Sequence, residues 1–154
     1  MQLCVYASTL ANEGKRYKAT FMNRVVSADY QTLLAENKPT IADQFEISPD
    51  AVNAYIEGMK LVTSSPQGTA FSVFGSYPIP VAGKTGTAEE HRGRSDNGAF
   101  ICFAPADDPQ IAIAVYIEKG GHGSTVASVA KAILDVYFDV DEVGDVNSFE
   151  NQIG

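Results

Sequence analysis

The sequence has no tryptophan, only two cysteines and only two histidines among its 154 residues. Cys4 and Cys102 lie far apart, each among apolar neighbours, which favours two buried free thiols over a disulfide or a metal site. Neither histidine has a cysteine pair near it, so the sequence argues against a zinc site. We therefore expect the protein to use neither a metal nor another cofactor.

Basic residues are also scarce, since 11 Lys and Arg stand against 19 Asp and Glu and the net charge is −8. The densest basic cluster, residues 15–18, is too small for a nucleic-acid surface. No apolar run reaches the roughly 20 residues of a membrane-spanning helix, and the N-terminus lacks a signal-peptide pattern. What the chain does have is an apolar content of 45%, which is enough for the core of one domain or part of one.

The most informative stretch is residues 77–89, which contains Lys84, Thr85, Gly86 and Thr87 in direct succession. Glycines inside a strand weaken it and usually let a ligand or another backbone approach closely. In an extended chain Thr85 and Thr87 project to one face, while Lys84 projects to the other. Two hydroxyl donors with an ammonium group behind them suit a carboxylate or a developing oxyanion, although a polar edge strand could carry the same residues.

The same residues could close a phosphate-binding P-loop, which has the pattern Gly-x-x-x-x-Gly-Lys-Ser/Thr. The position of its first glycine is occupied by Pro78, and Pro80 lies within the loop. A P-loop also needs a helix that starts at the lysine, whereas residues 86–98 contain three glycines and a cluster of charges. The sequence therefore disfavours a nucleotide-binding domain.

Hydrophobic periodicity predicts helices over residues 1–12, 49–62 and 125–138. The first has Gly14 at its C-cap, the second has Ser48 as its N-cap and Pro49 as its first residue, and the third is capped by Ser124 or Thr125. Residues 69–74 fit one or two further helical turns.

Strands are predicted over residues 16–28, 81–90, 99–104 and 110–118, with a weaker strand near residues 31–34 inside the polar segment 29–44. Residues 110–118 are almost continuously apolar, as in a central strand covered on both faces. The turns at 91–98 and 105–109 are short, which favours an antiparallel meander. The predicted fold class is α+β, an antiparallel sheet meander packed against helices over residues 1–138, followed by an acidic, disordered tail over 139–154.

The order of these segments resembles the C-terminal part of the transpeptidase domain of penicillin-binding proteins, in particular of class B members. The segments that carry the resemblance are residues 84–89, 100–105, 111–118, the glycine-rich 120–124 and the terminal helix. The helix of residues 2–14 is similar to the one that follows the active-site half in class B members. The resemblance covers residues 1–138, is weakest over 29–47, and implies the penicillin-binding and serine β-lactamase-like fold.

That family performs acyl transfer through a serine ester, using the motifs Ser-x-x-Lys, Ser-x-Asn and Lys-Thr-Gly. The third motif maps onto Lys84, Thr85 and Gly86. The resemblance implies that Lys84 lends positive charge to a proton relay and that Thr85 and Thr87 bind the carboxylate of a peptide or β-lactam. It also implies that the backbone N–H of Thr87 forms one arm of an oxyanion hole. Lys84 and Thr87 would thus be catalytic, while Thr85, Gly86 and Thr87 would bind substrate.

Matches to the other two motifs are in the wrong order. Residues 95–97 match Ser-x-Asn and residues 128–131 match Ser-x-x-Lys, but both follow Lys-Thr-Gly, whereas in the family they precede it. We interpret both as chance matches to permissive patterns. The chain then lacks a nucleophile and should be inactive alone. We expect the nucleophile in a missing N-terminal part of the same protein, which a helix beginning directly at Met1 also indicates.

The resemblance implies a D,D-transpeptidase that cross-links peptidoglycan, with a peptidoglycan stem peptide or a β-lactam as ligand and no nucleic-acid partner. It implies a place at the extracytoplasmic face of the bacterial membrane, through an anchor not present in this chain. The alternative is a non-catalytic β-lactam-binding sensor. We also expect this fragment to self-associate, because a half-domain leaves apolar surfaces uncovered. His122 fits a flexible linker better than catalysis, and His91, Arg92 and Arg94 fit a solvated turn.

Overall fold

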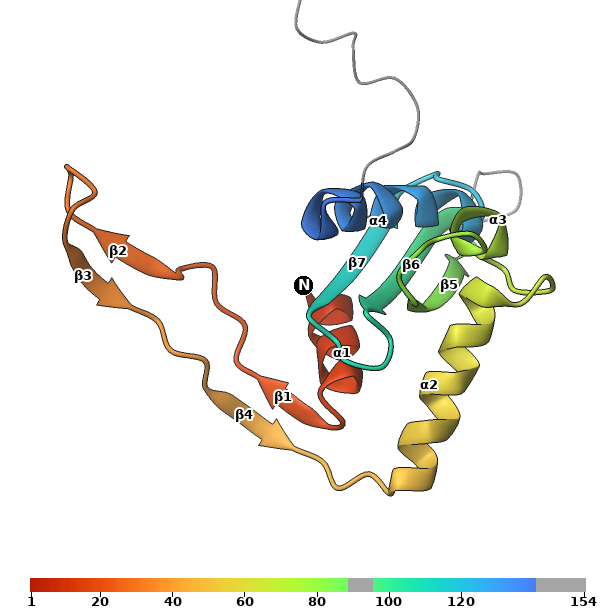
Figure 1. Ribbon diagram of the computed structural model, residues 1–154, viewed down its shortest axis with the longest axis horizontal. Helices are drawn as coiled ribbons and strands as arrows, with labels where there is room; N and C mark the ends of the chain where they lie inside the picture. Colours follow the sequence, from red (N-terminus) through yellow and green to blue (C-terminus); the bar gives the residue numbers. More distant parts are fainter. Residues whose placement is uncertain (89–95, 141–154) are drawn as a thin grey trace, which may run out of the picture.

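The computed structural model describes residues 1–88 and 96–140 of the chain. Figure 1 shows a body of helices around a small sheet, and a long, thin arm that projects from it. The elements in chain order are α1 (Gln2–Ala11), β1 (Lys15–Tyr17), β2 (Arg24–Val26), β3 (Leu33–Glu36), β4 (Ile41–Gln44), α2 (Pro49–Ser64), α3 (Phe71–Phe74), β5 (Ala82–Ala88), β6 (Asn97–Ala104), β7 (Ile111–Ile117) and α4 (Gly123–Phe138). This mixture of helices and antiparallel strands confirms the predicted α+β class.

The sheet of the body is an antiparallel meander in the order β5-β6-β7. β6 lies in the middle and is almost wholly buried, and its Phe100 and Phe103 are fully enclosed. β5 and β6 pair in a continuous register, from Ala82 opposite Phe103 to Ala88 opposite Asn97. The short connections along this part of the chain correctly predicted the meander.

The prediction that residues 110–118 form a central strand is wrong. β7 lies at the edge of the sheet, and within the described residues it pairs only with β6. Its apolar sequence reflects the coverage of its two faces, because α1 and α4 both pack on it. An apolar run reports how many faces of a strand are covered, and it does not report how many neighbours the strand has.

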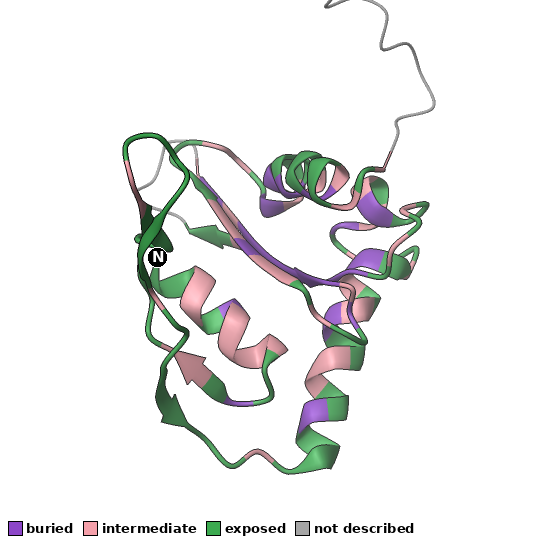
Figure 2. Ribbon diagram, turned by 60° about the vertical axis from the view of Figure 1, so that its left-hand side comes forward, coloured by how far each residue is buried: buried purple, intermediate pink, exposed green. Residues whose placement is uncertain are grey.

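Two apolar clusters fill the space between the sheet and its helices, and Figure 2 shows the sheet between α4 and the pair α1 and α2. The first cluster joins α4 and α3 to one face, and its buried members include Phe74, Phe100, Cys102, Val126, Ala130 and Leu134. The second cluster joins α1 and α2 to the other face. Its buried members are Met59, Ala82, Phe103 and Ala106, and the partly buried Leu10 packs against them. Helices on both faces therefore hold the sheet in place.

The structure confirms one of the three predicted helix caps and shifts the other two along the chain. Ser48 Oγ accepts a hydrogen bond from the backbone N–H of Ala51 at 3.3 Å, which confirms the predicted N-cap of α2. α4 starts at Gly123 with His122 as its N-cap, two or three residues before the predicted cap at Ser124 or Thr125, and His122 makes no side-chain capping bond. The C-cap of α1 is Asn12, so the prediction of Gly14 at this position is wrong by two residues. The chain turns away at Gly14, whose φ of +95° favours glycine. No helix within residues 1–88 or 96–140 has the length and apolarity to cross a bilayer.

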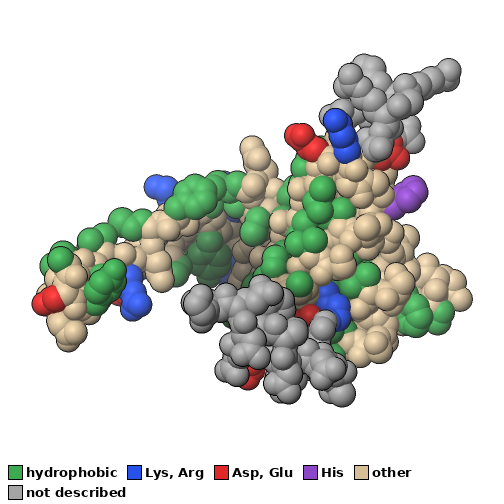
Figure 3. Space-filling model, turned by 90° about the horizontal axis from the view of Figure 1, so that it is seen from above, with side chains coloured by type: hydrophobic (Ala, Val, Ile, Leu, Met, Phe, Trp, Pro, Cys, Tyr) green, Lys and Arg blue, Asp and Glu red, His purple; other side chains and the backbone are tan. Residues whose placement is uncertain are grey.

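The arm consists of two short ladders, in which β1 pairs with β4 and β2 pairs with β3. The single strand predicted over residues 16–28 is therefore divided in two, and the polar segment after it holds two strands where one was predicted. Every residue of β3 and β4 is exposed. Apolar side chains gather along the arm in Figure 3, and the most exposed are Phe21 at 91% and Tyr30 at 82%. The arm thus has no core of its own.

The predicted tail and one predicted turn fall mostly outside the described residues. α4 ends at Phe138, and Asp139 follows it in the left-handed conformation. Residues 141–154 of the tail and residues 91–95 of the turn between β5 and β6 are not described.

Replacing Leu134 by alanine should lower the free energy of unfolding by about 2–5 kcal/mol, because Leu134 is fully buried between α4 and the sheet. Chemical denaturation of the isolated chain would measure the loss. Val136→Ala is the matched control on the same helix, since Val136 is 85% exposed, and it should change stability by less than about 0.5 kcal/mol. Equal losses in the two variants would contradict the packing of α4 described above.

Candidate active site

Lys84, Thr85, Gly86 and Thr87 lie in the middle of β5. Lys84 is opposite Ile101 of β6 and Thr87 is opposite Gly98. The chain remains a strand through all four residues, so no helix starts at Lys84 and the P-loop alternative is excluded. β5 is the other edge of the sheet, and within the described residues its pairing partner is β6 alone.

The two threonines share one cavity. Thr85 and Thr87 line a cavity of about 220 Å³ together with Thr69 and the residues that begin α4, His122, Gly123 and Ser124. The Oγ1 atoms of Thr69 and Thr85 are 2.7 Å apart and form a hydrogen bond in which either can donate. Four hydroxyl-bearing residues, three threonines and Ser124, thus line one small space at the N-terminal end of a helix. Such a set of donors, at the positive end of a helix dipole, favours an anionic group.

Lys84 lies on the opposite face of β5, as the alternation of a strand requires. It lines a groove of about 390 Å³ with Tyr6 and Leu10 of α1, Tyr55 and Met59 of α2, and Ile101 of β6. Its Nζ donates a hydrogen bond to the backbone carbonyl of Thr85 at 2.5 Å. Lys84 is exposed on the edge strand of the sheet, and it directly precedes Thr85 in the sequence.

The first turn of α4 packs directly on the backbone of β5. A Cβ atom at Gly123 would lie 2.6 Å from the carbonyl oxygens of both Gly86 and Ala99, so a side chain at this position would collide with the sheet. Only glycine lets α4 begin so close to the strand. The contact sets the distance between the helix N-terminus and the two threonines.

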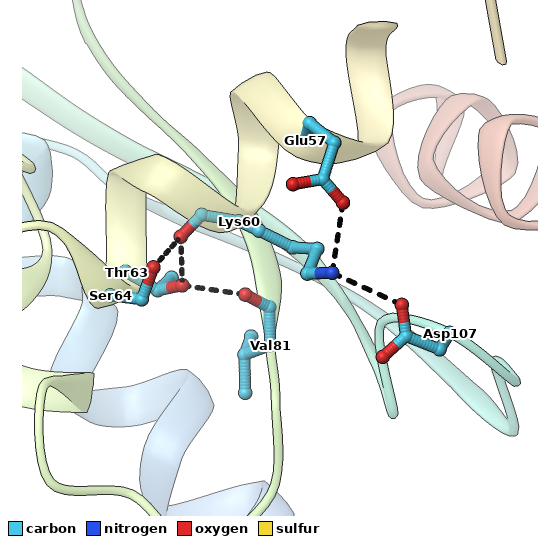
Figure 4. Close-up of polar contacts among 6 residues, drawn as sticks. All are labelled: Glu57, Lys60, Thr63, Ser64, Val81 and Asp107. Atoms are coloured by element: carbon cyan, nitrogen blue, oxygen red, sulfur yellow. Dashed lines mark hydrogen bonds and ion pairs between the residues drawn. The ribbon is translucent and has the colours of Figure 1, made fainter. Parts of the chain in front are cut away.

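α2 holds the start of β5 through Thr63, which is buried (Figure 4). Its hydroxyl lies 2.6 Å from the carbonyl oxygen of Val81 and 2.8 Å from that of Lys60, and it can donate to either. Lys60 also joins α2 to the turn between β6 and β7 through an ion pair with Asp107 at 3.1 Å, and it forms a second ion pair with Glu57 of α2 at 2.9 Å. These carboxylates, Glu57 first, raise the pKa of Lys60. Thr63 thereby ties the residue before β5 to α2, and Lys60 ties α2 to the turn between β6 and β7.

Both cysteines are free thiols, as predicted. Cys102 is fully buried in the centre of β6, and burial raises its pKa to about 12. Cys4 is only partly buried, which differs from the prediction, and its Sγ lies 3.6 Å from the carbonyl oxygen of Ala112. A thiol with so high a pKa is a poor nucleophile, so Cys102 serves the core.

The two out-of-order motif matches have contacts of their own. Asn97 is buried, and its Oδ1 accepts a hydrogen bond from the backbone N–H of Lys119 at 2.8 Å. Ser128 is exposed on α4 and donates to the carbonyl of Thr125 at 2.8 Å, whereas Lys131 forms an ion pair with Asp135 at 2.7 Å. Ser95, the serine of the Ser-x-Asn match, lies outside the described residues. The contacts of Asn97, Ser128 and Lys131 give these three residues structural roles and support our interpretation of the matches as chance.

The remaining polar candidates divide into two groups. His122, expected in a flexible linker, occupies the N-cap of α4 and lines the cavity of Thr85 and Thr87. His91, Arg92 and Arg94 lie outside the described residues. Among residues 1–88 and 96–140, no three His, Cys, Asp or Glu side chains come together in a way that could hold a metal ion.

Sequence reasoning missed Thr69 and Thr63. Both contact the motif strand through hydrogen bonds that span 16 and 18 residues along the chain. No local pattern reports such contacts, since threonine is common in loops and at helix ends. The only available signal was the glycine before Thr69: a Cβ at Gly68 would lie 2.4 Å from the carbonyl oxygens of Leu61 and Val62, so this loop must pass close to α2.

Comparison with known proteins identifies relatives of this chain. Residues 1–135 match the family model described as penicillin binding protein transpeptidase domain. Penicillin-binding protein 2A of Bacillus subtilis is 27% identical over 94% of the chain, and peptidoglycan D,D-transpeptidase MrdA of Escherichia coli is 33% identical over 51%. The chain spans about a fifth of the former relative (22%) and 15% of the latter. The crystal structure of Pseudomonas aeruginosa PBP2 in complex with WCK 5153 matches 96% of this chain and 32% of its own, with 30% identity and a TM-score of 0.69.

Thr63→Val should lower the free energy of unfolding by about 1–3 kcal/mol, because it removes the buried donor to the carbonyl of Val81 and keeps the shape of the side chain. Ser64→Ala is the matched control, since Ser64 also donates to the carbonyl of Lys60 but is exposed, and its effect should stay within about 0.5 kcal/mol. Denaturation of both variants would compare them. A Thr63→Val protein as stable as its parent would show that this bond does not hold β5 to α2.

Proposed function

This chain belongs to the penicillin-binding protein transpeptidase family, and we propose that it supplies the Lys84-Thr85-Gly86 wall of an active site that cross-links peptidoglycan through a serine acyl-enzyme. One observation carries the proposal: Thr85 and Thr87 converge with the N-terminus of α4 on a single cavity, while Lys84 extends from the opposite face of the same strand. A D,D-transpeptidase must hold an anionic peptide end, and it must stabilise the oxyanion that forms when its serine attacks.

Thr85 and Thr87 bind the carboxylate of the ligand. Their hydroxyls line the cavity of about 220 Å³, and the positive end of the α4 dipole lies beside them. A hydrogen bond to a carboxylate is worth about 1.5–3 kcal/mol, so two such donors give a useful preference for an acidic ligand. The ligand is a peptidoglycan stem peptide or a β-lactam. Because Gly86 has no side chain, the ligand can approach the backbone of β5 closely.

The oxyanion and the proton relay use the backbone of Thr87 and the side chain of Lys84. The N–H of Thr87 donates one hydrogen bond to the developing oxyanion, which contributes about 3 kcal/mol of transition-state stabilisation. Lys84 reaches into the groove between α1 and α2, and from there its positive charge favours loss of the serine proton. No metal or other cofactor takes part.

The nucleophile belongs to an N-terminal part of the same protein. Ser128 and Lys131 are occupied on α4, and the residues that line the groove of Lys84 and the cavity of Thr85 offer no Ser-x-x-Lys pair. The outer edge of β7 has no strand partner within the described residues, and α1 leaves Leu3 and Tyr6 about half exposed. The missing part would pack on these surfaces. It would also bring the anchor that holds the protein at the extracytoplasmic face of the membrane.

The complete protein should label covalently with fluorescent penicillin, and the isolated 154 residues should not. Lys84→Ala should slow labelling by at least about a hundredfold, because it removes the charge that assists proton transfer. Thr85→Val should slow it by about ten- to a hundredfold, because it removes one hydrogen bond to the ligand carboxylate. The second-order rate constant of labelling measures both effects.

Ser128→Ala is the control for this experiment, since we assign Ser128 no role in the reaction. Its labelling should equal that of the unchanged protein. Labelling of the isolated chain, lost in Ser128→Ala, would instead make Ser128 the nucleophile. Undiminished labelling of Lys84→Ala and Thr85→Val would refute the assignment of the motif. A protein that labels but neither releases the penicilloyl group nor joins peptides would be a β-lactam sensor.

We also expect the isolated chain to self-associate through the arm, which exposes Phe21 and Tyr30 almost completely. Light scattering should give a molar mass above the 16.5 kDa of the monomer. Replacing Phe21 and Tyr30 together by serine should shift the mass towards the monomer, whereas Val136→Ser on α4 should not. A single monomeric species at all concentrations would contradict this expectation.

A further inference from the structure

We propose that Thr69 is a positioning residue for the reaction, and that its hydroxyl group orients the hydroxyl of Thr85 towards the carboxylate of the ligand. This inference rests on the proposed function of Thr85. The observation that carries it is the 2.7 Å hydrogen bond between the two Oγ1 atoms, at the wall of the cavity that both residues line with Thr87.

The position of Thr69 is imposed by the fold. Ala70, which follows it, is fully buried, and its backbone N–H donates to the carbonyl of Val62 at 2.9 Å. Gly68, which precedes it, donates its N–H to the carbonyl of Ser65 at 2.7 Å and lies too close to α2 for a side chain. Thr69 is therefore an exposed side chain on a backbone that is tied to α2 on both sides.

A hydroxyl group has one hydrogen, and this decides what the pair can do. If Thr85 donates to Thr69, the hydrogen of Thr85 is used and cannot reach a ligand. If Thr69 donates to Thr85, the hydrogen of Thr85 is free to point into the cavity. A carboxylate in the cavity favours the second arrangement, because a hydrogen bond to a charged acceptor is about twice as strong as one between neutral groups.

The second arrangement is a chain of two hydrogen bonds, from Thr69 to Thr85 and from Thr85 to the carboxylate. Each bond in such a chain polarises the next, so Thr85 is a better donor while it accepts from Thr69. Thr69 does not itself touch the ligand. It acts through Thr85 alone, and its contribution should therefore vanish when Thr85 has no hydroxyl or when the ligand has no carboxylate.

The test uses the complete protein, benzylpenicillin and its methyl ester, whose carboxylate is blocked. Thr69→Val keeps the shape of the side chain and removes the hydroxyl. It should lower the ratio of the two acylation rate constants, acid over ester, by about three- to tenfold. Thr69→Ser keeps the hydroxyl and should restore most of the ratio. Ser72→Ala, at an exposed hydroxyl on the adjacent α3, should leave the ratio unchanged.

A second comparison places Thr69→Val in a Thr85→Val background, where it should have no further effect on the ratio. An unchanged ratio in Thr69→Val, or an equal loss with both ligands, would overturn the inference and leave the proposed function standing. A lower ratio that Thr69→Val still causes in the Thr85→Val background would likewise overturn the inference and leave the proposed function standing. Because both ligands are compared on the same protein, a loss of folded Thr69→Val protein cannot imitate the result. A parent protein that reacts with neither ligand would overturn the proposed function and this inference with it.

Discussion

The candidate site depends on holding an edge strand still. β5 is hydrogen-bonded along one side only within the described residues, and a strand in that position can move unless other elements fix it. Two contacts do so. Thr63 binds the carbonyl of Val81 just before the strand begins, and Gly123 packs against the backbone of Gly86 near its middle. Both contacts act on the backbone of β5, and the position of this backbone determines where the side chains of Lys84, Thr85 and Thr87 lie.

A single strand also separates two chemical functions. Since side chains alternate along β5, Lys84 extends towards α1 and α2, and Thr85 and Thr87 extend towards α4. The positive charge and the hydroxyl donors are thus neighbours in sequence, yet they lie in separate grooves. An extended ligand along the edge of β5 would meet the threonines on one side and the lysine on the other. The arrangement needs no long loop, because the pleat of the strand provides it.

Local features of the fold and site could be predicted from the sequence, and contacts between distant segments could not. Ser48 and Pro49 marked the start of α2, and the alternation of Lys84 with Thr85 gave their opposite faces, because both follow from neighbours in the chain. The edge position of β7 was missed because its apolar residues report covered faces only. Thr69, His122 and Gly123 were missed as parts of the site. Their packing against β5 depends on where the whole helices α2 and α4 lie relative to the sheet, and no local pattern reports this.

The order in which a ribosome makes the chain gives the cavity of Thr85 and Thr87 a further property. Its walls come from three places: Thr69 in the loop after α2, the two threonines of β5, and residues 122–124 at the start of α4. Synthesis runs from the N-terminus, so the motif emerges some 35 residues before the last wall. The cavity stays open on one side until α4 has emerged and packed on the sheet. A nascent chain that stops short of Gly123 would carry the complete Lys-Thr-Gly motif and still have no closed pocket for a ligand.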